Sequence, residues 1–131
     1  MNSGTDLELF SRETPSVAVI GLGYVGLPLA LELVRGGCRV VGVDIDESKA
    51  SALMEGRSYI KDISPDRITS ALSTGRFGAS TDMAAVREVD AIIIAVPTPL
   101  GPARDPDLSF VLSTAEGISA HLRKGQLVVL E

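Results

Sequence analysis

The chain has 131 residues, of which 45% are apolar and 22% charged, and this composition is typical of one globular domain and not of a disordered protein. No apolar run approaches the roughly 20 residues that span a bilayer. The net charge of −5 argues against broad nucleic-acid binding, which needs a basic face. The N-terminus lacks a basic segment followed by an apolar one, so we expect no signal peptide, no membrane association and a cytoplasmic location.

The first part of the chain predicts a tail followed by a strand–helix–strand unit. Residues 1–14 are polar and aperiodic and are interpreted as an N-terminal tail, with one domain over 15–131. The apolar run at 17–20 predicts a buried strand. Apolar residues then recur on one helical face until the glycine pair at 36–37, where we expect the helix to end. Residues 40–44 predict a second strand.

The middle of the chain continues the alternation of helices and strands. Asp46 is a suitable cap for a helix that runs to Gly56. A serine followed by proline starts a further helix over 64–75, because proline is favoured at the first helical position. A weaker strand is expected at 77–81, followed by a short helix from about Asp82 to Arg87.

The strongest strand pattern in the chain covers residues 91–96. The segment 97–106 contains four prolines, which remove backbone donors and exclude helix or central strand. Asp107 is expected to cap the next helix, and residues 126–130 to form a fifth strand. The expected inner face of that helix consists of Phe110, Val111, Thr114, Ile118 and Leu122.

Strands that alternate with helices imply right-handed crossovers and a parallel sheet with helices on both faces. We therefore predict an α/β fold of the Rossmann type, with strand order 3-2-1-4-5.

A glycine-rich motif of the form G-x-G-x-x-G follows the first predicted strand and opens the first predicted helix. Gly21 permits the tight turn, Gly23 allows a pyrophosphate to approach the backbone, and Gly26 allows close packing of helix on strand. The helix N-terminus offers free amides and a positive dipole end to phosphates. The motif consists of Gly21, Leu22, Gly23, Tyr24, Val25 and Gly26.

An acidic residue stands at the end of the second predicted strand. Asp44 follows Gly26 by 18 residues, a position from which a carboxylate accepts hydrogen bonds from the adenosine ribose. Asp46 and Glu47 follow closely, and three acidic residues would repel a 2′-phosphate. The pattern therefore favours NAD over NADP as the cofactor.

Residues 19–30, which contain the run Gly-Tyr-Val-Gly-Leu, closely resemble the opening of the nucleotide-sugar 6-dehydrogenases, the UDP-glucose/GDP-mannose dehydrogenase family. The Val-Pro-Thr-Pro segment at 96–99 is a second match, and the ending Val-Val-Leu-Glu at 128–131 is a third. The resemblance covers residues 17–131. Residues 59–63 and the loop from 97 look most like the UDP-N-acetyl-hexosamine branch, and the Glu-Pro-Gly pattern usual in UDP-glucose enzymes is missing.

The resemblance implies a full-length NAD-dependent enzyme that oxidises the carbon-6 alcohol of a UDP-sugar to a uronic acid for polysaccharide synthesis. It implies two hydride transfers to NAD, through a cysteine thiohemiacetal and a thioester. The family's catalytic cysteine, lysine and carboxylates belong to a region beyond residue 131. We therefore expect no catalytic residue and no metal site in this chain, which would be an inactive fragment without the central and C-terminal substrate domains. A homo-oligomer is expected for the full-length enzyme.

Only cofactor positions carry over from the resemblance. The family often has an arginine five residues after the ribose aspartate, and Lys49 stands there instead. Lysine keeps the charge but lacks the planar surface that could stack on adenine. The candidate cofactor-binding residues are Gly21, Leu22, Gly23, Tyr24, Val25, Gly26, Asp44, Lys49, Val96, Pro97, Thr98 and Glu131.

Two other functions fit the sequence. The first is a stand-alone NAD-sensing regulatory module, which would not need the proline-rich loop after the fourth strand. The second is the cofactor domain of a hydroxyacyl or sugar-phosphate dehydrogenase. The continuation of the gene separates these alternatives, because a Gly-Gly-Ser-Cys-like loop downstream would identify the nucleotide-sugar enzyme.

Overall fold

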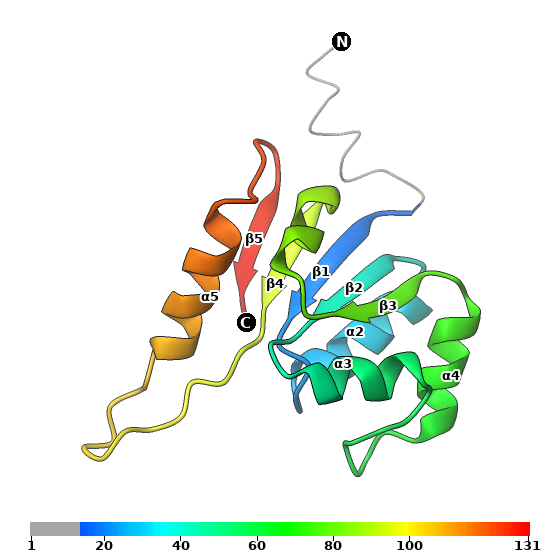
Figure 1. Cartoon of the computed structure of the whole chain (residues 1–131), viewed down its shortest axis with the longest axis horizontal. Helices are drawn as coiled ribbons and strands as arrows, with labels where there is room; N and C mark the ends of the chain where they lie inside the picture. The colour runs from blue at the N-terminus through cyan, green and yellow to red at the C-terminus, as the bar shows by residue number, and fades with distance from the viewer. Residues whose placement is uncertain (1–13) are drawn as a thin grey trace.

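A five-stranded parallel sheet forms the centre of the computed structural model, which describes residues 14–131 (Figure 1). The strand order is β3-β2-β1-β4-β5, and every neighbouring pair is parallel. The predicted fold class and strand order are confirmed. Apart from Thr14, the predicted tail lies outside the described residues. The strands are β1 (Ser16–Ile20), β2 (Arg39–Val43), β3 (Phe77–Ser80), β4 (Ala91–Ile94) and β5 (Leu127–Leu130).

Helices cover both faces of this sheet (Figure 1). One apolar cluster joins three α-helices to one face, and a second cluster joins a 3₁₀ helix and the last α-helix to the other face. The first face carries α2 (Gly26–Arg35), α3 (Glu47–Met54) and α4 (Pro65–Ser73), and the second carries η1 (Met83–Glu88) and α5 (Ser109–Ser119).

The central strand β1 shows why both faces are covered. Val17 and Val19 belong to the cluster on the α2 face, whereas Ala18 and Ile20 belong to the cluster on the η1 face. All four side chains are buried. Successive strand residues point to opposite faces, so an unbroken apolar run requires a sheet that is buried on both sides.

The predicted helix starts at Asp46 and Ser64 are confirmed. The Asp46 carboxylate accepts a hydrogen bond from the Ser48 N–H at 2.9 Å, and the Ser64 hydroxyl accepts one from the Arg67 N–H at 3.4 Å. The Asp46 carboxylate satisfies a backbone donor of the first helical turn, and the Ser64 hydroxyl adds a second acceptor for the Arg67 N–H, which also donates to the Ser64 carbonyl at 3.1 Å.

The predicted short helix after β3 is confirmed: it is the 3₁₀ helix η1, which Asp82 caps through the Ala84 N–H at 2.9 Å. The predicted cap of the last helix is wrong, because α5 has Leu108 and not Asp107 at its N-cap. Asp107 lies one residue earlier, where its carboxylate still accepts from the Ser109 N–H at 2.9 Å.

The predicted inner face of α5 is only partly buried. Thr114 and Ile118 are buried, but Phe110 is 42% exposed and Leu122, which follows the helix, is 44% exposed. Ile118 joins the cluster on the η1 face, and Gly117 approaches Met83 of η1. Helix α5 therefore contacts η1 through the side that carries Gly117 and Ile118, while the side chains of Phe110 and Leu122 stay exposed.

Within residues 14–131, no helix is long and apolar enough to cross a membrane.

Candidate functional site

The turn after β1 brings the glycine-rich loop close to the end of β4. Gly21 has a φ of +98° and donates its N–H to the Val43 carbonyl at 2.8 Å. A Cβ at Gly21 would lie 2.6 Å from the Ala95 carbonyl oxygen. Glycine is therefore required here both by the backbone conformation and by the approach of β4.

Gly26 allows α2 to begin directly against this turn. A Cβ at Gly26 would overlap the Gly21 carbonyl and would lie 3.4 Å from the Ala95 Cβ. The two glycines thus depend on each other: the backbone of the first occupies the space that a side chain at the second would need. This is the close helix–strand packing expected of the third glycine of the motif.

Gly23, by contrast, faces open space, because a Cβ there would meet nothing within 4 Å. Among the hydrogen bonds of residues 14–131, no acceptor serves the N–H groups of Gly23, Tyr24 and Val25. Val25 is the N-cap of α2 and provides no side-chain cap, and Tyr24 is 78% exposed. The loop therefore presents free backbone donors at a helix N-terminus, which is the arrangement that binds anions.

Asp44 lies immediately after β2 and connects two loops. Its Oδ2 accepts a hydrogen bond from the Leu22 N–H at 2.9 Å, and its Oδ1 accepts one from the Asp46 N–H at 2.9 Å. A carboxylate can accept about four hydrogen bonds, so each Asp44 oxygen can still accept a second one. Asp44, which is predicted to bind the ribose, thus lies next to the glycine-rich loop and fixes the loop through the Leu22 N–H.

Tyr59 reaches the same loop from the segment after α3. Its hydroxyl donates to the Leu22 carbonyl at 2.6 Å, and the Lys49 ammonium lies 5.7 Å from the centre of its ring. Burial, together with the charges of Asp44 and Asp46, raises the pKa of Tyr59 above its ordinary value. Lys49 therefore contacts the aromatic ring of Tyr59 in this structure. The tyrosine was not among the predicted site residues, because 37 residues separate it from its partner in the loop.

Asp46 and Glu47, which follow Asp44, are exposed. The Ser48 hydroxyl and N–H both donate to the Asp46 carboxylate, at 2.6 and 2.9 Å, and these bonds lower the pKa of Asp46 below its ordinary value. Asp46, two residues from Asp44, therefore stays ionised to more acidic pH than an ordinary aspartate.

The other predicted site residues follow β4 and β5, at the same carboxyl edge of the parallel sheet. Pro97 and Thr98 are exposed, and Val96 packs partly against the cluster on the η1 face. The Glu131 N–H donates to the Ile94 carbonyl at 2.9 Å, which keeps the end of β5 beside the end of β4. These residues lie on the β4–β5 side of the edge, whereas the glycine-rich loop and Asp44 follow β1 and β2.

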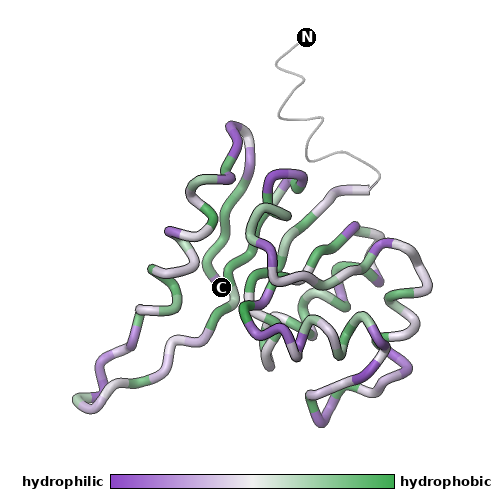
Figure 2. The backbone as a smooth tube through the Cα atoms, in the orientation of Figure 1, coloured by the Kyte–Doolittle hydropathy of each residue, from purple (hydrophilic) through white to green (hydrophobic). Residues whose placement is uncertain are grey.

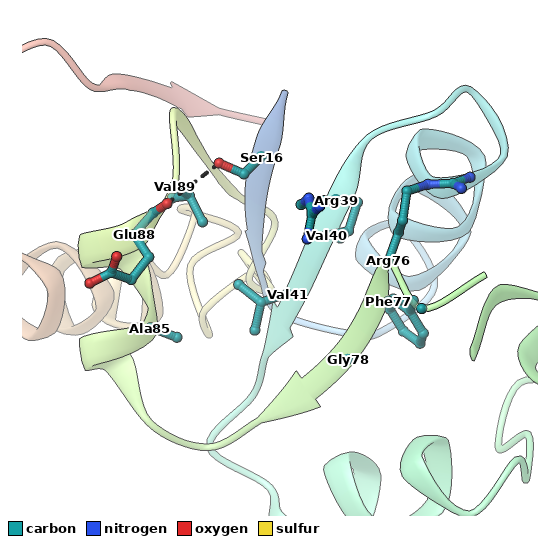
Figure 3. Close-up of a pocket in the computed structure, with 11 residues that line it drawn as sticks. Ser16, Arg39, Val40, Val41, Arg76, Phe77, Gly78, Ala85, Glu88 and Val89 are labelled. Carbon is teal, nitrogen blue, oxygen red and sulfur yellow. Dashed lines mark hydrogen bonds between the residues drawn. The ribbon is translucent and has the colours of Figure 1, made fainter. Parts of the chain in front are cut away.

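A separate cavity of about 460 Å³ lies over β1, β2 and β3, toward the start of the strands (Figure 3). Its lining includes Ser16, Arg39 and Arg76, which stand at or before the first residue of a strand, and Ala85 and Glu88 of η1. Ligands of open α/β sheets bind outside the carboxyl ends of the strands, so this cavity is not the predicted cofactor site. No cluster of three metal-binding side chains occurs in the described part of the chain.

The chain is similar in sequence to proteins of one enzyme family. A model of the UDP-glucose/GDP-mannose dehydrogenase family, NAD binding domain, matches residues 15–131. An NDP-N-acetyl-D-galactosaminuronic acid dehydrogenase of Ralstonia nicotianae and a UDP-N-acetyl-D-mannosamine dehydrogenase of Escherichia coli are each 39% identical over 119 residues, covering 88% of this chain. The chain spans 27% of the length of each of these relatives.

A solved structure supports the same assignment at the level of the fold. A UDP-glucose dehydrogenase from Pyrobaculum islandicum superposes with a TM-score of 0.85 at 34% identity, over 92% of this chain and 29% of that one. Together with the family match over residues 15–131, this likeness shows that the chain belongs to the UDP-glucose/GDP-mannose dehydrogenase family, in which it corresponds to the NAD-binding domain.

Proposed function

We propose that the loop of residues 21–26 binds the pyrophosphate of NAD and that Asp44 binds the adenosine ribose. The observation that carries the proposal is the set of free N–H groups at Gly23, Tyr24 and Val25, which adjoin open space beside Asp44. A pyrophosphate needs several donors and close approach to the backbone, and a helix N-terminus supplies both. The residues present therefore fit this cofactor.

The charges beside Asp44 support a preference for NAD over NADP. Asp46 carries a carboxylate whose pKa is lowered by Ser48, and Glu47 is exposed at the start of α3. A 2′-phosphate would bring a further negative charge next to these groups, whereas the free 2′-hydroxyl of NAD can donate a hydrogen bond to Asp44.

We assign the remaining predicted residues to other parts of the cofactor. Leu22 contributes its backbone to the loop, while Val96, Pro97, Thr98 and Glu131 line the nicotinamide half of the carboxyl edge. Lys49 contributes a positive charge and does not stack on adenine, because its ammonium lies over the ring of Tyr59. When bound, NAD accepts a hydride from the carbon that is oxidised; these residues bind and orient it.

For the whole protein we propose oxidation of the carbon-6 alcohol of a UDP-N-acetyl-hexosamine to a uronic acid used in polysaccharide synthesis. The names of the two relatives, an N-acetyl-galactosaminuronic acid and an N-acetylmannosamine dehydrogenase, support this substrate class. We further propose that the full-length enzyme is a cytoplasmic homo-oligomer. Formation of NADH from UDP-N-acetyl-hexosamines and from UDP-glucose by the full-length protein tests the substrate, and light scattering tests the assembly.

Calorimetric titration of the 131-residue chain with NAD and NADP tests the cofactor site directly. We expect NAD to bind more tightly, and we expect Asp44→Ala to weaken NAD binding by about 1–3 kcal/mol. Because Asp44 also accepts from Leu22 and Asp46, the melting temperature of the variant must be measured alongside. Equal affinities for the two cofactors would contradict the role of Asp44, and NADH production by the chain alone from any UDP-sugar would contradict the assignment of catalysis to other regions.

A further inference from the structure

Leu22, the second residue of the glycine-rich loop, is held at three points. Its N–H donates to Asp44 at 2.9 Å and its carbonyl accepts from the Tyr59 hydroxyl at 2.6 Å. Its side chain is fully buried over Gly42 of β2, where an added Cβ would lie 2.6 Å from a Leu22 methyl carbon. Because its backbone N–H, its backbone carbonyl and its side chain are all held, Leu22 has little freedom to change its backbone conformation.

The carbonyl of Leu22 and the N–H of Gly23 belong to the same peptide unit. A peptide unit is planar, and in the trans form its C=O and N–H point in opposite directions. No peptide bond in the described residues is cis. The Leu22 carbonyl points toward Tyr59, to which it is hydrogen-bonded, so the Gly23 N–H points away from Tyr59. On that side of the loop, the Gly23 N–H has no acceptor among the described residues.

Tyr59 is itself well placed to hold this orientation. Its ring packs against the apolar cluster on the α2 face, and the Lys49 ammonium lies 5.7 Å from the ring centre. Its hydroxyl is a donor at neutral pH, as an ordinary tyrosine hydroxyl is, and the raised pKa of Tyr59 extends that state to more alkaline pH. The chain has two tyrosines, and the other, Tyr24, is exposed in the loop itself.

We propose that Tyr59 is a positioning residue for the pyrophosphate: by donating to the Leu22 carbonyl, it fixes the direction in which the Gly23 N–H meets the ligand. This inference rests on the proposed NAD site. Without the hydroxyl, the peptide between Leu22 and Gly23 can rotate, and binding must then restore the orientation that the parent protein already has. Preorganised donors bind more tightly than mobile ones for this reason.

Tyr59→Phe tests the proposal, because it removes one oxygen and keeps the ring that packs against the core and Lys49. Binding of NAD, ADP and adenosine is measured by titration for parent and variant. We expect NAD and ADP, which both carry the pyrophosphate, to bind about five- to tenfold more weakly, the effect of losing one hydrogen bond. Adenosine, which lacks phosphate, should bind equally to both proteins.

Thr74→Val is the matched control. The Thr74 hydroxyl donates to the Ala71 carbonyl at 2.6 Å and accepts from the Arg76 N–H at 3.0 Å, at the end of α4 next to the start of β3. The variant loses both of these hydroxyl hydrogen bonds, but at the opposite edge of the sheet from the loop. We expect it to lower the melting temperature at least as much as Tyr59→Phe and to leave all three affinities unchanged.

The amide signal of Gly23 gives a readout that a purely stabilising role would not alter. In the ligand-free protein, the ¹⁵N–¹H signal of Gly23 should broaden in Tyr59→Phe, because the Leu22–Gly23 peptide exchanges between orientations, and should stay sharp in Thr74→Val. A Tyr59→Phe variant that binds NAD as the parent does, or that loses adenosine as strongly as NAD, would overturn the role of Tyr59 alone. A parent chain that binds neither NAD nor ADP would overturn the proposed cofactor site itself.

Discussion

The glycines of the loop after β1 differ in the reason that each must be glycine. Gly21 and Gly26 are required by the fold, because a side chain at Gly21 would collide with the backbone of Ala95 after β4, and a side chain at Gly26 would collide with the carbonyl of Gly21. Gly23 has open space around it and a backbone N–H without an acceptor among the described residues. The same residue type is therefore required by the fold at two positions and, in our proposal, by the ligand at the third.

Alanine substitutions separate these two requirements. Gly23→Ala should leave the melting temperature nearly unchanged and weaken NAD binding strongly, because its methyl group would enter the space proposed for the pyrophosphate. Gly26→Ala should lower the free energy of unfolding by about 1–3 kcal/mol or more without any ligand, through overpacking against Gly21. Thermal unfolding and NAD titration of both variants check the contrast. Parent-like NAD affinity in Gly23→Ala would remove the main support for the pyrophosphate site.

Tyr59 should make stability sensitive to alkaline pH. Its folded-state pKa is raised by burial and by the neighbouring charges of Asp44 and Asp46. A raised pKa means that the stability contributed by the neutral phenol is complete below the unfolded value of about 10 and is lost as the pH rises toward the folded value. Urea unfolding between pH 8 and pH 11 should show the parent losing more stability than Tyr59→Phe. Parallel losses in both proteins would contradict this prediction.

Much of the site is predictable from the sequence because its signals are local. The spacing of Gly21, Gly23 and Gly26 sets the loop, and Asp44 follows directly from the end of β2. The contribution of Tyr59 is not local: its contact with Leu22 depends on how the segment after α3 folds back, which no spacing rule encodes. The binding roles of all these residues remain predictions.

At the scale of elements, a helix start is predictable where the capping residue is followed by a residue that also favours the first turn of a helix. Ser64 is followed by Pro65, and Asp46 is followed by the acidic residue Glu47, so two sequence signals mark each of these starts. Before α5 the signal is ambiguous, because Asp107 bonds to the Ser109 N–H two residues later while the helix begins with Leu108 as N-cap. Such an Asx-type bond and an N-cap look alike in sequence. Likewise, the spacing of Met83–Glu88 does not distinguish an α-helix from the observed 3₁₀ helix.

The cap of α4 provides an element-scale prediction. Ser64→Ala should lower the free energy of unfolding by about 1 kcal/mol, because the Arg67 N–H loses its side-chain acceptor. Ser70→Ala, on the exposed surface of the same helix, is the control and should leave stability unchanged or slightly raised, because alanine favours helix. Urea denaturation of the three proteins checks this. Equal stability of the parent and Ser64→Ala would show that the Ser64 carbonyl, which also accepts from the Arg67 N–H at 3.1 Å, is a sufficient acceptor.

At the scale of the whole molecule, the alternation of strands and helices predicts the strand order. It does not predict which apolar side chains are buried. Central strands such as β1 are covered on both faces, whereas Leu127, Val128 and Leu130 of β5 are exposed, as are Phe110 and Leu112 of α5. Figure 2 shows that apolar residues continue along β5 nonetheless. Periodicity indicates which side chains are apolar, and only the tertiary arrangement decides which of them are covered.

This uneven burial predicts uneven stability along the sheet. The Asp90 N–H donates to the Ser16 carbonyl of β1 at 2.9 Å, and the Leu127 N–H donates to the Asp90 carbonyl at 3.1 Å, so both bonds lie at the same end of the sheet. Strand β5 has a neighbour on one side only and exposed side chains. Amide hydrogen exchange should therefore be at least about tenfold faster at Leu127 than at Asp90, because local opening of β5 exposes little apolar surface. Equal protection at the two amides would show instead that β5 opens only when the whole sheet unfolds.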